Sequence, residues 1–243
     1  MTANDALLLI GHGSARYPDA GRALHHHAQG LRGTTRFAQV EVALLNGSPS
    51  VADALVRIET ATIRVVPFFM EDGYFTRVAV PKAFGSRPVI IVPPVGIHHG
   101  MAGLIERQAL LACADLGIAS RAAAVLVIGH GSSRAPGRAL ALHRHATRVA
   151  ATQLFARVET ACLEEAPFVP DTLCRLRSHP VVVIGFFAGE GGHVRDDLPA
   201  LIGSEQAGRG KAGLAVRFHG SVADDPAMTE IILDQATRDP TGE

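Results

Sequence analysis

Three side chains in the second half of the sequence are of types that could share a metal ion. His130 follows the apolar run AVLVIG, Glu164 follows the run VETACL, and His193 follows the run VVVIGFF after a glycine-rich segment. Two imidazoles and one carboxylate suit a first-row divalent cation with open coordination positions. The separations of 34 and 29 residues are too long for a local metal-binding motif. We therefore predict a metal site that only the tertiary fold can assemble.

Glycine-rich runs and arginines surround these three positions. The runs GHGSS and GEGGH would let the backbone approach a flat ligand closely and expose N–H groups at helix starts. Arginines near the two histidines could form a rim that binds carboxylates. The predicted substrate-binding residues are Ser132, Arg134, Arg138, Gly191, Gly192 and Arg195.

An internal repeat defines the elements that must position these side chains. At an offset of 118, IGHGSARYP lies over IGHGSSRAP, and the match runs without a gap through 70 pairs, of which 28 are identical. Unrelated segments would share far fewer, so the chain is a duplication. We predict two domains, residues 1–119 and 120–243.

The two copies differ at the chemically important positions. At the same offset of 118, the counterparts of His130, Glu164 and His193 in the first copy are His12, Asn46 and Phe75. A phenylalanine ring cannot ligate a metal. We therefore expect a degenerate site in the first copy and a working site in the second.

Short apolar runs alternate with helical stretches in each copy, as in βαβ units. The fold class predicted is α/β, with two tandem parallel-sheet domains of flavodoxin-like order 2-1-3-4. Each strand is apolar enough to be buried on both faces. In the second copy, strands are expected at 124–128, 158–163, 181–187 and 214–218, and helices at 139–155 and 194–203. Pro199 should kink or delimit the latter helix. Ligands are expected at the carboxyl ends of strands 1 and 3.

The motifs GHGSSR, LEEAP and FFAGEGGHVRDDLP resemble those of the sirohydrochlorin chelatases of the CbiX/SirB type, over nearly the whole chain. This resemblance implies a chelatase-type fold with two domains facing across a cleft. It also implies a lyase that inserts Co²⁺ or Fe²⁺, with Ni²⁺ a further candidate, into sirohydrochlorin or a similar polycarboxylated tetrapyrrole of cobalamin or siroheme biosynthesis. The metal is then a substrate, and no permanently bound cofactor is expected.

The resemblance further implies catalytic roles for His130, His193 and Glu164, with Glu165 an alternative to Glu164. Insertion requires two pyrrole protons to leave as the ion enters, so metal ligands and bases are needed on one face. Histidine can serve both purposes near neutral pH. We also expect an apolar wall for the ring, built from Phe168, Phe186 and Phe187.

Composition restricts the remaining possibilities. Lys plus Arg equals Asp plus Glu at 23 each, which argues against nucleic-acid and anionic-membrane partners. The three cysteines form no C-x-x-C pair, and no segment reads as a signal peptide or membrane span. We expect a cytoplasmic protein, monomeric with an internal pseudo-dimer.

Two other functions could use a histidine in this place. Histidine phosphatases also place a histidine after a strand, but they need an arginine before it, where this chain has Gly11 and Gly129. A non-catalytic carrier or sensor of metal or metallotetrapyrrole would use the same ligands as a chelatase, so it stays an alternative. The histidine run His25, His26 and His27 is expected to be structural or to lie at the surface, because successive helical residues point about 100° apart and cannot all face one ion.

Overall fold

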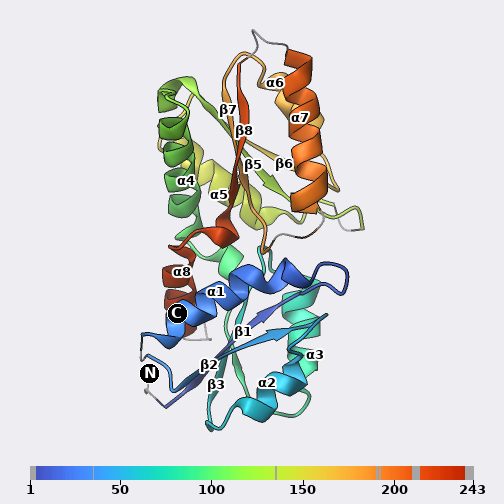
Figure 1. The fold of residues 1–243 in the computed structure, drawn as a ribbon, viewed down its shortest axis with the longest axis vertical. Coiled ribbons are helices and arrows are strands. Elements are labelled where there is room, and N and C mark those ends of the chain that lie inside the picture. The colour runs from blue at the N-terminus through green and yellow to red at the C-terminus, as the bar shows by residue number, and fades with distance from the viewer. Residues whose placement is uncertain are drawn as a thin grey trace. The chain divides into compact units, whose positions relative to one another are not determined.

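The computed structural model describes residues 4–34, 36–134, 136–189, 191, 193–209 and 214–238, without the side chains of Pro18, His193 and Arg209 (Figure 1). The chain divides into two compact units. Unit 1 comprises Met1–His98 and Pro226–Glu243, and unit 2 comprises His99–Asp225.

Each unit contains one four-stranded, wholly parallel sheet. The order is β2-β1-β3-β4 in unit 1 and β6-β5-β7-β8 in unit 2, so the predicted order 2-1-3-4 and the α/β class are confirmed. The strands of unit 1 are β1 (Ala6–Gly11), β2 (Gln39–Leu44), β3 (Ile63–Pro67) and β4 (Ile90–Ile91). Those of unit 2 are β5 (Ala124–Gly129), β6 (Arg157–Cys162), β7 (Val181–Gly185) and β8 (Val216–Ser221).

Burial differs between the central and the edge strands of unit 2. Every residue of β5 and β7 is buried, as expected for strands covered on both faces. Most residues of β6 and β8 are partly or fully exposed, so the prediction of four buried strands is wrong for these two. Their place at the sheet edges leaves one side of each strand without a neighbour.

Helices cover the sheets through amphipathic faces. They are α1 (Arg22–Arg32), α2 (Val51–Arg57), α3 (Val80–Phe84), α4 (Met101–Asp115), α5 (Leu140–Ala151), α6 (Val169–Arg175), α7 (Leu198–Arg209) and α8 (Met228–Thr237). The helix expected at 139–155 is α5, four residues shorter at its end. The helix expected at 194–203 is a π-helical turn, His193–Asp197, followed by α7. Pro199 occupies the second position of α7, directly after the π-helical turn.

The last helix of each repeat packs in the unit formed by the other repeat. Helix α4 belongs to the first repeat but contacts α5 and β7 of unit 2, and α8 belongs to the second repeat but contacts α1 and β3 of unit 1 (Figure 1). The predicted ranges 1–119 and 120–243 follow the sequence repeat, whereas the compact units exchange these helices.

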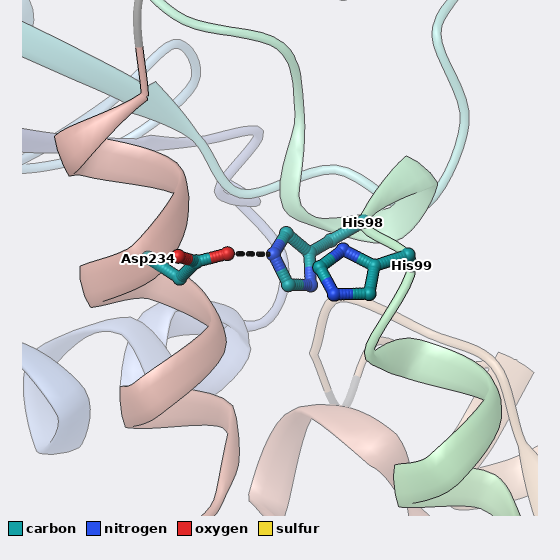
Figure 2. Close-up of side chains that lie close together, drawn as sticks. All are labelled: His98, His99 and Asp234. Atoms are coloured by element: carbon teal, nitrogen blue, oxygen red, sulfur yellow. Dashed lines mark hydrogen bonds and ion pairs between the residues drawn. The ribbon is translucent and has the colours of Figure 1, made fainter.

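Specific hydrogen bonds fasten α8 to unit 1. Nε2 of the buried His98 lies 2.6 Å from Oδ2 of Asp234 on α8, as Figure 2 shows. This bond is the main reason why the pKa of Asp234 lies below its usual value, and Arg238 adds to the effect. The side-chain amide of Gln235 donates to the carbonyl of Pro93 at 2.8 Å. Helix α8, Met228–Thr237, thus packs on the first sheet although it lies near the other end of the sequence.

Helix α4 is fastened to unit 2 in a similar way. Its buried Gln108 donates to the carbonyl of Ser221 at 3.3 Å, and Arg107 forms an ion pair with the buried Asp225. Among the described residues, no helix has the length and apolar character needed to cross a membrane.

Candidate metal centre

The pairing of β5 with β6 brings His130 and Glu164 together. The parallel register ends with Gly129 opposite Cys162, and the backbone N–H of Glu164 then donates to the carbonyl of His130 at 2.9 Å. The two residues therefore leave the sheet side by side at the carboxyl ends of neighbouring strands, where open α/β sheets place ligands.

Their side chains face each other and remain accessible. Nε2 of His130 lies 3.8 Å from Oε1 of Glu164, with the side chains 48% and 38% exposed. That distance exceeds a hydrogen bond. Two ligand atoms that each lie about 2.0–2.2 Å from one ion are separated by roughly 3–4 Å, so the pair has the spacing of shared ligands.

The orientation of the His130 ring suits metal binding through Nε2. Nδ1 lies 3.2 Å from the carbonyl oxygen of Gly131, and a carbonyl can only accept, so Nδ1 carries the proton in this bond. In the neutral ring the lone pair is then on Nε2, the atom that faces Glu164. Metal-binding histidines are commonly held in this way by a hydrogen bond at the other ring nitrogen.

The third predicted ligand, His193, begins the π-helical turn that follows β7, and its side chain lies outside the described residues. Its counterpart, Phe75, begins the equivalent π-helical turn of unit 1, Phe75–Ala79. Both turns start at the same position of the repeat, so the two units share this irregular element.

In unit 1 the three counterpart side chains are in contact. Nδ2 of Asn46 lies 3.0 Å from Nδ1 of His12, and the ring centroids of His12 and Phe75 are 4.5 Å apart. The Phe75 ring also stacks on Phe69, with centroids 5.9 Å apart and planes inclined by 14°. The fold of unit 1 thus brings positions 12, 46 and 75 together, but an amide and a phenyl ring replace the charged and imidazole ligands.

Glu165, the alternative carboxylate, has a different environment from Glu164. It is 6% exposed, and its Oε2 accepts a hydrogen bond from the backbone N–H of Gly137 at 2.5 Å. Its carboxylate is therefore engaged beneath the loop that follows β5, whereas that of Glu164 faces His130. The geometry favours Glu164 as the metal-binding carboxylate.

The predicted substrate-binding residues lie on two loops. Ser132 is partly buried, whereas Arg134 and Arg138 are exposed, and neither arginine forms an ion pair with any residue in the described part of the chain. Gly191 is partly buried, Arg195 is exposed on the π-helical turn, and Gly192 lies outside the described residues. The exposed guanidinium groups leave cationic charge on the loop after β5.

The counterpart of Arg195 in unit 1 is Arg77, which forms an ion pair with Asp72. Nε and Nη2 of Arg77 donate to Oδ2 of Asp72 at 3.0 and 2.8 Å. These bonds are the main cause that lowers the pKa of Asp72 and raises that of Arg77. Arg77 is thereby committed to a local ion pair.

The predicted apolar wall is wrong in two of its three members. Phe186 and Phe187 are buried, and Phe187 belongs to the hydrophobic core of unit 2. Residues that directly continue a central strand into the core cannot present their rings to a ligand. Phe168, at the start of α6, is exposed.

The histidines on α1 and α5 include both buried and exposed side chains. His27 is buried on α1 with Nδ1 2.9 Å from Oγ1 of Thr229, and His25 and His26 are exposed. The expectation of structural or surface roles for this run is confirmed. On α5, Nδ1 of His143 lies 2.9 Å from Oγ1 of Thr160.

Each of the two sequence repeats matches the same family of known proteins. The CbiX family model matches residues 6–110 and again 124–239, so its two matches begin 118 residues apart. The chain belongs to the CbiX family. A protein of Halobacterium salinarum, named probable sirohydrochlorin cobaltochelatase, is 24% identical over 270 residues, covering 95% of this chain and 90% of that protein.

Solved structures share the fold of this CbiX family member. A multi-domain protein of Deinococcus radiodurans, described as structurally similar to chelatases, is 25% identical with a TM-score of 0.80 over 97% of this chain, which spans only 55% of its length. A CbiX described as the terminal enzyme of siroheme biosynthesis in denitrifying bacteria is 25% identical with a TM-score of 0.71, covering 97% and 100% of the two chains. SirB from Bacillus subtilis with Fe³⁺, at 17% identity and a TM-score of 0.79 over 96% and 94%, shares the fold.

Proposed function

We propose that this CbiX family member inserts a divalent metal ion, Co²⁺ or Fe²⁺, into sirohydrochlorin or a similar polycarboxylated tetrapyrrole. The metal would bind at His130, Glu164 and His193 of unit 2. Support comes from the family, from the name of the Halobacterium relative, and above all from the facing side chains of His130 and Glu164 at 3.8 Å.

The place of His193 in this site is inferred from unit 1. There, the counterpart Phe75 contacts His12, and His12 contacts Asn46. Because the two units share the strand order and the π-helical turn, the same three positions in unit 2 are expected to converge. In unit 2 these positions carry two imidazoles and one carboxylate, which suit a divalent first-row metal.

The chemistry of insertion assigns a role to each side chain. The bond from Nδ1 of His130 to the Gly131 carbonyl orients the ring so that Nε2, the nitrogen that faces Glu164, would bind the incoming ion. As the ion enters the macrocycle, two pyrrole N–H protons must leave. The accessible carboxylate of Glu164, or a histidine that has released the metal, would accept them.

The loop after β5 suits a polyanionic substrate. Arg134 and Arg138 are exposed and could pair with substrate carboxylates, and Ser132 adds a hydroxyl donor. Arg195 and the glycines Gly191 and Gly192 would complete this binding surface. The overall neutral charge of the chain means that any attraction for a polyanion must come from such local groups.

The test is anaerobic mixing of the full chain with metal-free sirohydrochlorin and Co²⁺, Fe²⁺ or Ni²⁺, following the absorption change on metallation. Many product molecules should form per protein molecule, faster than in the protein-free control. Stoichiometric binding of metal or macrocycle without turnover would reject the enzyme and favour a carrier or sensor. The metal that gives the highest kcat/KM identifies the preferred substrate ion.

A further inference from the structure

Glu165 is buried at the base of the loop that carries the exposed arginines. Its Oε2 accepts from the N–H of Gly137, near one end of this loop. At the other end, Gly131 packs so closely on the same side chain that a Cβ added there would lie 2.7 Å from Cγ and 3.1 Å from Oε1 of Glu165. Gly131 and Gly137, near the two ends of this loop, therefore both contact one carboxylate.

One oxygen of this carboxylate is buried at a cost in stability. Within the described part of the chain, Oε1 of Glu165 is buried and has no hydrogen-bond partner. A buried carboxylate oxygen without a donor lowers the stability of the folded state. A residue that carries such a cost is expected to contribute to function.

The duplicated sequence provides an internal comparison. The counterpart of Glu165 is Gly47, which has no side chain, so unit 1 lacks this contact between β2 and the loop after β1. In unit 1 the backbone N–H of Tyr17 instead donates to Oγ of Ser14 within the loop, at 3.1 Å. The carboxylate beneath the loop occurs in the unit that carries the complete ligand set.

We propose that Glu165 is a positioning residue that holds the Gly131–Arg138 loop so that Arg134 and Arg138 can bind the carboxylates of the tetrapyrrole. This inference rests on the proposed function for its substrate. Glu165 does not touch the metal. Its contribution should therefore appear in KM for the macrocycle, while kcat and the affinity for Co²⁺ stay unchanged.

Two substitutions of similar size isolate the hydrogen bond. Glu165→Gln keeps an oxygen that can accept from Gly137, whereas Glu165→Met fills the same buried space without an acceptor. The matched control is Glu159→Gln on β6, where the glutamate forms an ion pair with Arg157 at 3.7 Å. We expect Glu165→Met to raise KM for sirohydrochlorin by roughly tenfold, and Glu165→Gln and Glu159→Gln to stay close to the wild type.

Limited trypsin digestion tests the same contact without any enzyme activity. Cleavage after Arg134 and Arg138 should be slower in the wild type and in Glu165→Gln than in Glu165→Met, because cleavage depends on the population of the opened loop. Cleavage after Arg157 serves as the reference within each sample.

The outcomes separate this inference from the proposed function. Equal protection and equal KM in Glu165→Met and the wild type would overturn it, as would a Glu165→Gln variant that behaves like Glu165→Met. Weakened Co²⁺ binding in Glu165→Gln would make Glu165 a metal ligand and also overturn it. If the wild type shows no turnover, the proposed function fails, and the trypsin comparison still decides whether Glu165 holds the loop.

Discussion

Nε2 of His130 lies 3.8 Å from Oε1 of Glu164 across the ends of two neighbouring strands. The first unit places the amide of Asn46 against His12 at the same position of the repeat. The two units thus bring the same two repeat positions together, through Nε2 of the histidine in unit 2 and Nδ1 in unit 1, and they differ in ligand chemistry. This difference makes the two halves of one chain controls for each other.

Removal of single histidines should affect the two halves unequally. His130→Ala and His193→Ala should each weaken Co²⁺ binding by at least about a hundredfold, because each removes a direct ligand. His12→Ala should change it little, because its neighbours are an amide and a phenyl ring. Calorimetric titration with Co²⁺ measures this, and equal losses in all three variants would refute a single site in unit 2.

The first unit should gain a metal site when its ligands are restored. Phe75 and Asn46 both contact His12, so Phe75→His with Asn46→Glu would place two imidazoles and a carboxylate together. In a His130→Ala background, this double substitution should recover Co²⁺ binding at micromolar or tighter affinity. A background that stays unable to bind Co²⁺ would show that positions 12, 46 and 75 do not have ligand geometry.

Fragments of the chain should fold according to the compact units and not the repeat. Residues 99–225 contain α4, whose buried side chains cover unit 2, whereas residues 120–243 lack it. Each Leu, Ile or Met side chain that α4 buries contributes about 1.5–3 kcal/mol, and a whole domain has only about 5–15 kcal/mol. We expect cooperative thermal unfolding, measured by circular dichroism, for 99–225 only.

A cooperative transition in the 120–243 fragment would contradict this expectation. It would mean that α8 can replace α4 on the second sheet. The full chain, unfolded under the same conditions, provides the reference signal.

The bond between His98 and Asp234 should give a pH-dependent contribution to stability. The pKa of Asp234 is lowered in the folded state, so its contribution is present at neutral pH and is lost as the pH falls below about 4. The Asp234 side chain is 51% exposed, so solvent screening limits the effect to about 1 kcal/mol or less.

Asp234→Asn should therefore lower the free energy of urea unfolding at pH 7, and its difference from the wild type should shrink as the pH falls through the depressed pKa. Glu230→Gln, an exposed change on the same helix, is the control. A difference that is constant down to pH 3 would exclude the ionised carboxylate as its cause.

Much of the architecture could be predicted from the sequence. The apolar periodicity and the internal repeat can both be recognised without knowledge of the tertiary structure. The four strands per unit and their order followed from apolar runs and from crossover rules. The exposure of β6 and β8 was missed because composition reports apolar character and does not report whether a strand has a second neighbour.

The site could be predicted less completely. Glu164 and Glu165 are adjacent and chemically identical, and only the structure shows that one faces His130 while the other lies under the loop. The glycine at position 47 was the available signal, since it marks a place where one half has a buried side chain and the other has none. The burial of Phe186 and Phe187 depends on how the strand continues into the core, which residue type alone does not reveal.

The exchange of helices also determines which unit can be completed first during translation. Unit 2 is continuous, from His99 to Asp225, and can be completed once that stretch has emerged. The first sheet emerges earlier, yet it lacks a covering element until α8 has been translated. The unit that carries the predicted metal ligands is therefore finished before the unit that precedes it in the chain.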